Sequence, residues 1–121
     1  IIGMSGGFDS TDLVYLAKEK LGLRPLVFHV DTGWNTPESV HNIEKIVFAL
    51  GLELHTEVID WEEMRDIQLA FFKAGVPHID VPQDHACFAT MYKFASDYDV
   101  KYILTGGNYS TECKAASRHP P

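Results

Sequence analysis

The feature that most constrains the fold is a polar, glycine-bearing stretch near the start of the chain, Ser5-Gly6-Gly7-Phe8-Asp9-Ser10-Thr11. Apolar residues 1–4 precede it, and a helical pattern of leucines follows it, which predicts a strand, a tight turn and a helix N-terminus. The first amides of a helix have no partner within the helix, and the helix dipole favours negative charge there. We therefore expect this stretch to bind phosphate, the glycines through the backbone and Ser5, Ser10 and Thr11 through their hydroxyls.

The same stretch differs from two common phosphate-binding motifs. Residues 5–11 contain no Lys or Arg, so the lysine-bearing P-loop is excluded, and G-x-G-x-x-G does not occur. The stretch does contain a carboxylate, Asp9, which is favourable beside a phosphate mainly when Mg²⁺ lies between the two groups. We therefore predict that Mg²⁺ lies between Asp9 and a bound phosphate.

Composition limits the classes of protein to consider. The chain has 121 residues with 45% apolar content, enough for one small globular domain, and no apolar run reaches the length of a membrane span. Acidic residues outnumber basic ones 17 to 10, which is unfavourable for binding a nucleic-acid backbone. Its two cysteines, Cys87 and Cys113, form neither a metal-binding pattern nor a disulfide framework, so we expect a cytoplasmic protein.

Apolar runs alternate with helical patterns along the chain, which predicts an α/β fold with an open parallel sheet and helices on both faces. Thr36 and Pro37 form a strong helix start signal. The predicted strands are 1–4, 25–30, 53–59 and 101–105, and the predicted helices are 9–21, 37–50, 61–74 and one from about 83 to 98.

Three polar segments follow predicted strands, namely 5–11, 31–36 and 105–112. Ligands of open parallel sheets lie beyond the carboxyl ends of the strands, so these segments are expected to form one site. Within it, Asp31 is either a ribose ligand or a turn acid, and Trp34 either stacks on the nucleoside or packs at the edge. His29 lies within an apolar strand and has the position of a satisfied core histidine.

The stretch from Ser5 to Ser10 resembles the signature S-G-G-x-D-S of the pyrophosphate-loop (PP-loop) ATP pyrophosphatases, which have a Rossmann-like fold. This resemblance implies ATP as the ligand, together with Mg²⁺, and cleavage of ATP between the α- and β-phosphates, with Asp9 and Ser10 as the candidate catalytic residues. It also implies that backbone groups at His29, Val30 and Asp31 contact the nucleoside, and that Thr105, Gly106 and Gly107 complete the nucleotide site. In amide-forming members a glutamate six residues after a glycine helps to hold Mg²⁺, which implies Glu112 as a second metal ligand beside Asp9.

Longer runs, including 23–31, 40–46, 60–66, 82–85 and 105–112, resemble the N-acetyl sugar amidotransferases of bacterial surface-polysaccharide and lipopolysaccharide synthesis. This finer resemblance implies that an acetamido group on a nucleotide-linked sugar is adenylated and then converted to an acetamidino group by ammonia from a glutaminase partner. Members of that family are far longer than 121 residues, so the chain is expected to be an N-terminal ATP-binding part.

Three alternatives stay open. Val30-Asp31-Thr32-Gly33 followed by Pro37-Glu38 resembles the second-strand motif of sulfonucleotide reductases, although the intact phosphate loop argues against a reductase. A tRNA-modifying enzyme of the same superfamily would be expected to have a basic surface or paired cysteines. A nucleotide-binding sensor without catalysis would have the same sheet and no metal role for Asp9.

Overall fold

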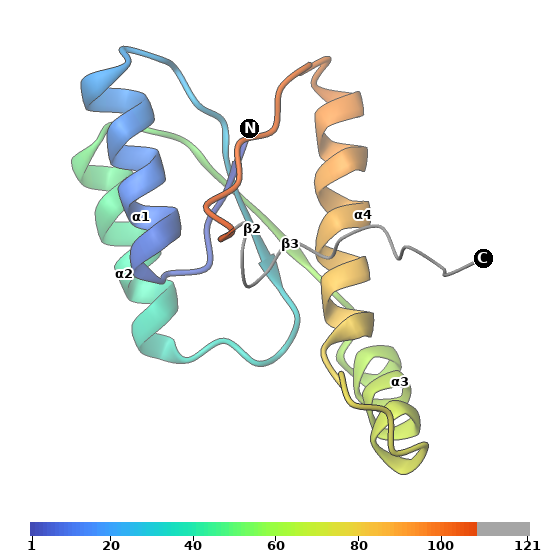
Figure 1. Ribbon diagram of the computed structural model, residues 1–121. Helices are drawn as coiled ribbons and strands as arrows, with labels where there is room; N and C mark the ends of the chain where they lie inside the picture. The colour runs from blue at the N-terminus through green and yellow to red at the C-terminus, as the bar shows by residue number, and fades with distance from the viewer. Residues whose placement is uncertain (109–121) are drawn as a thin grey trace.

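The computed structural model describes residues 1–108, which form a parallel sheet between two layers of helices (Figure 1). The strands are β1 (Ile2–Gly3), β2 (Val27–Asp31) and β3 (Leu54–Val58), in the order β1-β2-β3. The helices are α1 (Phe8–Tyr15), which continues as the π-helix η1 (Leu16–Lys20), α2 (Pro37–Ala49), α3 (Trp61–Lys73) and α4 (Val81–Asp97). The predicted fold class is confirmed.

Alternating side chains of the strands divide the core into two halves. Ile2 and Val27 pack with α1 and α2 on one face, where Val14 and Ile43 are almost fully buried. Phe28 points to the other face and packs against α4 through Met91. Because successive side chains of a strand point to opposite faces, a sheet with two apolar faces needs helices on both.

The start of α2 shows how local sequence sets an element. Thr36 has an extended backbone and its hydroxyl accepts a hydrogen bond from the Ser39 amide at 3.2 Å, and Pro37 is the first helical residue. The helix therefore begins where the sequence predicts. In contrast, α4 begins at Val81, two residues before the predicted start at Gln83.

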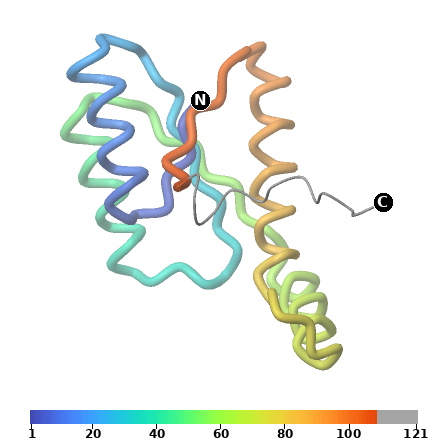
Figure 2. Tube along the Cα trace, viewed as in Figure 1, coloured from blue at the N-terminus to red at the C-terminus, as the bar shows by residue number. Residues whose placement is uncertain are grey.

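The predicted fourth strand over 101–105 is wrong in extent. Within the described residues this segment makes only one parallel bridge, between Leu104 and Ile2, with the Leu104 amide donating to the Ile1 carbonyl at 2.9 Å. Because β1 contains only Ile2 and Gly3, it offers few backbone groups for pairing. The segment nevertheless lies on the side of β1 opposite β2, as the trace shows (Figure 2).

This arrangement makes β1 the point where the strand order reverses, with all pairings parallel. The chain proceeds from β1 to β2 and β3 on one side, and returns at Leu104 on the other. Crevices at such points are the usual ligand sites of open α/β sheets. The segments that follow Gly3 and Leu104 therefore leave the sheet side by side.

Candidate functional site

The turn between β1 and α1 is held by its own hydroxyl groups. The Ser10 hydroxyl accepts from the Ser5 amide at 3.2 Å and lies 3.3 Å from the Gly7 carbonyl, to which it donates. Thr11 donates to the same carbonyl at 2.8 Å, and the Ser5 hydroxyl accepts from the Gly7 amide at 3.4 Å. The hydroxyls of Ser10 and Thr11 thus serve to shape the turn.

The N-terminus of α1 is open. Its N-cap residue is Gly7, and no side chain caps the helix. The amides of Phe8, Asp9 and Ser10 have no acceptor within the helix, because those groups precede the first helical hydrogen bond. This first turn of α1 can therefore bind an anion through backbone amides and the helix dipole.

Two glycines allow other backbone segments to approach this turn. Gly6 has φ +83°, and a Cβ atom there would lie 2.9 Å from the Ser39 carbonyl oxygen of α2. A Cβ atom on Gly106 would lie 3.0 Å from the Asp9 carbonyl oxygen. The turn is thus enclosed between the start of α2 and the segment that follows Leu104.

A cavity of about 230 Å³ lies where these segments meet. Its lining residues are Gly3, Ser5, Asp9, Ser10, Gly106 and Gly107. Five of the six were predicted as site residues, and Gly3 was missed because it reads as part of a strand. Thr105 is not among the lining residues, and Glu112 and Cys113 lie outside the described residues.

The residues at the carboxyl end of β2 do not line the cavity. His29 is buried, as expected for a core histidine, and both its ring nitrogens lie within hydrogen-bond distance of partners. The Asp31 carboxylate accepts from the Gly33 amide at 2.9 Å, so this side chain acts as a turn acid. Nucleoside contacts by His29, Val30 and Asp31 stay a prediction.

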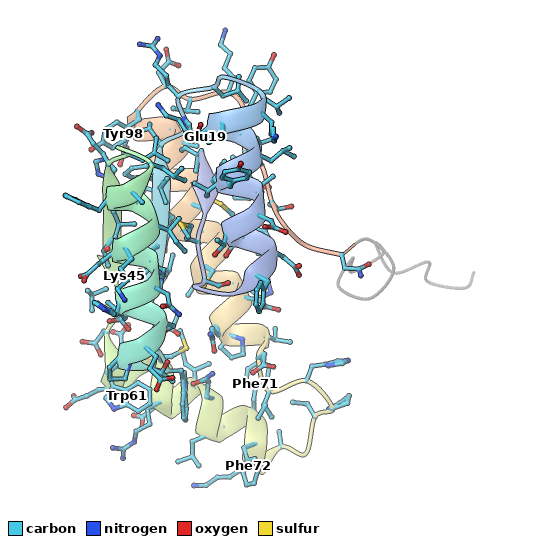
Figure 3. The ribbon with its side chains drawn as sticks, turned by 90° about the vertical axis from the view of Figure 1, so that its left-hand side faces the viewer. Glu19, Lys45, Trp61, Phe71, Phe72 and Tyr98 are labelled. Atoms are coloured by element: carbon cyan, nitrogen blue, oxygen red, sulfur yellow. The ribbon has the colours of Figure 1, made fainter. Side chains whose placement is uncertain are left out.

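Trp61 lies at the start of α3 (Figure 3), and its ring packs against the segment that follows β2. Gly33 has φ +93°, and a Cβ atom there would lie 2.2 Å from the Trp61 ring, so any other residue would strain the backbone and displace the ring. Trp34 packs edge-on against Trp61 with ring centroids 5.3 Å apart, and its indole donates to Gln68 at 2.7 Å. The packing interpretation of Trp34 accounts for these contacts. No local signal in the sequence pointed to Trp61.

A larger cavity of about 400 Å³ lies between α3 and α4. Its wall is mainly apolar, with Glu63 and His85 as its charged or titratable members. The smaller cavity is the better candidate for a phosphate site, because phosphate needs backbone or side-chain donors and the apolar wall offers few of them.

Cys87 on α4 is unsuited to nucleophilic chemistry. Burial raises the pKa of its thiol, and the Asp84 carboxylate raises that pKa further. The reactive thiolate is therefore a smaller fraction of this cysteine than of a free one at neutral pH.

We expect Cys87, in a Cys113→Ser background, to react with iodoacetamide at pH 8 more slowly than a cysteine peptide. The rate should rise with pH and reach the peptide value after denaturation, because unfolding removes the burial. Asp84→Asn should raise the rate in the folded protein. A folded-state rate equal to that of the peptide would contradict the raised pKa.

Metal ligands are few in the described part of the chain. Among residues 1–108, no group of three or more His, Cys, Asp and Glu side chains could hold a metal ion. Mg²⁺ commonly uses one or two carboxylates together with substrate phosphates and water. Asp9, at the wall of the phosphate-sized cavity, fits that pattern.

None of the helices formed by residues 1–108 has the length and apolar character to cross a membrane.

Comparison with known proteins shows the family. Residues 1–108 match the phosphoadenosine phosphosulfate reductase domain. A sulfate adenylyltransferase subunit 2 from Streptomyces lavendulae is 42% identical over 57 residues, covering 45% of this chain and 18% of that protein. A tRNA-specific 2-thiouridylase, MnmA 2, from Fusobacterium nucleatum is 27% identical over 122 aligned positions, covering 93% of this chain and 34% of that protein.

The chain thus spans about a third or less of the length of these two relatives. Neither relative is a sugar amidotransferase, so the finer resemblance receives no support, and the comparisons favour the other PP-loop enzymes that were considered. The matched domain, the open turn at α1 and the cavity beside it agree on one assignment: the chain belongs to the phosphoadenosine phosphosulfate reductase domain family, within the PP-loop superfamily of adenine nucleotide α-hydrolases.

Proposed function

We propose that this protein cleaves ATP between the α- and β-phosphates and transfers the adenylyl group to an oxyanion acceptor. The observation that carries the proposal is the cavity at the open N-terminus of α1. Its volume of about 230 Å³ is below the range of about 300–1,000 Å³ typical of whole-ligand pockets. It therefore suits the phosphate part of a nucleotide, with the nucleoside outside it.

The turn supplies binding and charge stabilisation. Backbone amides at the start of α1 and the Ser5 hydroxyl donate to the β- and γ-phosphates, and Gly106 and Gly107 allow the phosphates to approach the backbone. Donors fixed in place by the hydrogen bonds of Ser10 and Thr11 need no rearrangement as negative charge develops on the leaving group.

Asp9 is the residue of the described chain that would hold Mg²⁺ against the phosphates, and the predicted second ligand is Glu112. When bound, the ion supplies neutralisation of the charge that builds up on the departing pyrophosphate. In the reaction an acceptor oxygen attacks the α-phosphorus, the bond from that phosphorus to the bridging oxygen breaks, and pyrophosphate leaves with the electron pair.

A small oxyanion such as sulfate is the favoured acceptor. The name of the relative with 42% identity denotes adenylyl transfer to sulfate. A formal net charge of −7 is unfavourable for binding the polyanionic backbone of tRNA. Reductase chemistry requires a reactive thiol, and Cys87, the free cysteine of the described residues, has a raised pKa. Nothing in the two relatives' names supports a nucleotide sugar or a glutaminase as a partner.

Phosphorus NMR of ATP with Mg²⁺, sulfate and the protein tests this function. Release of pyrophosphate that depends on sulfate, together with an adenylylated product, is the expected result. Parallel reactions with tRNA or with an acetamido nucleotide sugar in place of sulfate identify the acceptor if sulfate gives no turnover. Formation of ADP and phosphate would contradict cleavage at the α-phosphate, and intact bound ATP in every reaction would favour the sensor alternative.

A further inference from the structure

The buried His29 side chain joins two segments that leave neighbouring strands. Its Nδ1 atom lies 2.8 Å from the carbonyl oxygen of Met4, the residue directly before the phosphate-binding turn. Its Nε2 atom lies 2.9 Å from the side-chain nitrogen of Asn35, in the segment after β2. One imidazole ring therefore connects the phosphate side of the proposed nucleotide site to its nucleoside side.

The partners of His29 fix the tautomer of its neutral ring. A carbonyl oxygen can only accept, so Nδ1 carries the hydrogen and donates to Met4. In the neutral ring Nε2 then accepts from the Asn35 amide group. Both ring nitrogens are thus used in fixed directions, and with 4% exposure the ring offers no surface to a ligand.

The bond to Met4 replaces a backbone hydrogen bond. The register of β1 with β2 ends at Gly3 and Phe28, and the Met4 amide still donates to the Phe28 carbonyl at 2.8 Å. The His29 side chain binds the next carbonyl, that of Met4, so the chain can leave the sheet at Ser5 without losing this buried hydrogen bond. Ser5, where the chain leaves the sheet, is the first residue of the phosphate-binding turn.

We propose that His29 is a positioning residue which, through Asn35, holds the segment after β2 at a fixed distance from the phosphate-binding turn. This inference rests on the proposed nucleotide site. ATP spans both segments, since its phosphates lie at the turn and its nucleoside lies toward β2. Tripolyphosphate has no nucleoside, so it contacts only the phosphate-binding turn. Loss of the link therefore weakens ATP binding and leaves tripolyphosphate binding unchanged.

Asn35→Ala tests the link, because Asn35 is only half-buried and its removal leaves the His29 bond to Met4 in place. We expect the Kd of Mg²⁺-ATP, measured by calorimetry, to rise about two- to tenfold, the usual effect of one hydrogen bond, and the Kd of Mg²⁺-tripolyphosphate to stay constant. The matched control is Asn42→Ala, the same change at an exposed position of α2.

A second variant separates the link from a direct contact between Asn35 and the nucleotide. His29→Asn keeps a donor for the Met4 carbonyl but cannot reach Asn35, so it should weaken ATP binding to the same degree, and the double variant should be no weaker than either single one. Equal losses for ATP and tripolyphosphate, unchanged ATP binding, or additive effects in the double variant would each overturn the inference. Wild-type protein that binds neither ligand would contradict the proposed function itself, and the inference with it.

Discussion

Replacing Asp9 with asparagine lowers the rate of pyrophosphate release by about 100-fold, the usual effect of removing one group that stabilises a transition state. Asp9 lines the phosphate-sized cavity at the start of α1, where it is the proposed ligand of Mg²⁺. Asparagine keeps the shape of the side chain and removes its charge, so the metal is bound less tightly while the turn keeps its geometry. Steady-state rates at several Mg²⁺ concentrations measure the effect, which excess Mg²⁺ should partly reverse.

The same variant should have the opposite effect on a ligand without metal. A carboxylate close to phosphate oxygens repels them, so Asp9→Asn tightens the binding of tripolyphosphate when Mg²⁺ is absent and weakens it when Mg²⁺ is present. The matched control is Asp12→Asn, the same change at an exposed position of α1 that does not line the cavity. Weaker binding under both conditions would show that Asp9 supports the fold of the turn and holds no metal.

The phosphate side of the site could be predicted because its signals are local. Ser5, Asp9 and Ser10 lie within one short stretch, and the strand before it and the helix after it fix how that stretch is used. The segment 105–112, which contains Gly106 and Gly107, was placed at the site by the rule that strand ends gather at one edge of the sheet. The rule needs only approximate strand positions, so it held although the segment 101–105 forms a single bridge.

Contacts between distant segments could not be predicted in this way. The sequence indicates a buried histidine at position 29, but its bonds to Met4 and Asn35 depend on the register of β1 with β2. Similarly, Gly33 reads as a turn residue, whereas its close contact with Trp61 depends on where α3 begins. Contacts of this kind depend on how distant segments pack against each other, and the spacing of residues along the chain does not predict them.

The sequence constrains the acceptor less than the phosphate site for a chemical reason. Members of one superfamily that cleave ATP at the same bond can use the same turn, the same open helix N-terminus and the same metal ligand, whatever oxygen attacks. Residues 5–10 therefore identify the superfamily and say little about the acceptor. The runs that resemble sugar amidotransferases lie mainly outside this turn, and the comparisons favour other members of the superfamily.

Gly6→Ala should abolish most ATP binding, and Gly51→Ala should not, although both glycines have a left-handed backbone. Gly6 has φ +83° and Gly51 has φ +64°, so alanine at either position costs about 1–2 kcal/mol of stability. A new Cβ atom at Gly51 meets nothing within 4 Å, whereas at Gly6 it lies 2.9 Å from the Ser39 carbonyl oxygen. That oxygen belongs to the backbone of α2 and cannot rotate away, so the turn itself must move.

Displaced amides at the start of α1 lose hydrogen bonds to the phosphates, and a hydrogen bond to a charged group contributes about 1.5–3 kcal/mol, so we expect the affinity of Gly6→Ala for ATP to fall about 100-fold. Urea denaturation and calorimetry on both variants separate the two effects, since Gly51→Ala measures the backbone cost without the contact. Adding Ser39→Gly to Gly6→Ala removes the Ser39 Cβ atom, also 2.9 Å away, but leaves the carbonyl oxygen, so it should restore affinity only in part. If Gly6→Ala binds ATP as well as Gly51→Ala does, then the contact with α2 does not set the position of the turn, and the donors of α1 alone account for its affinity.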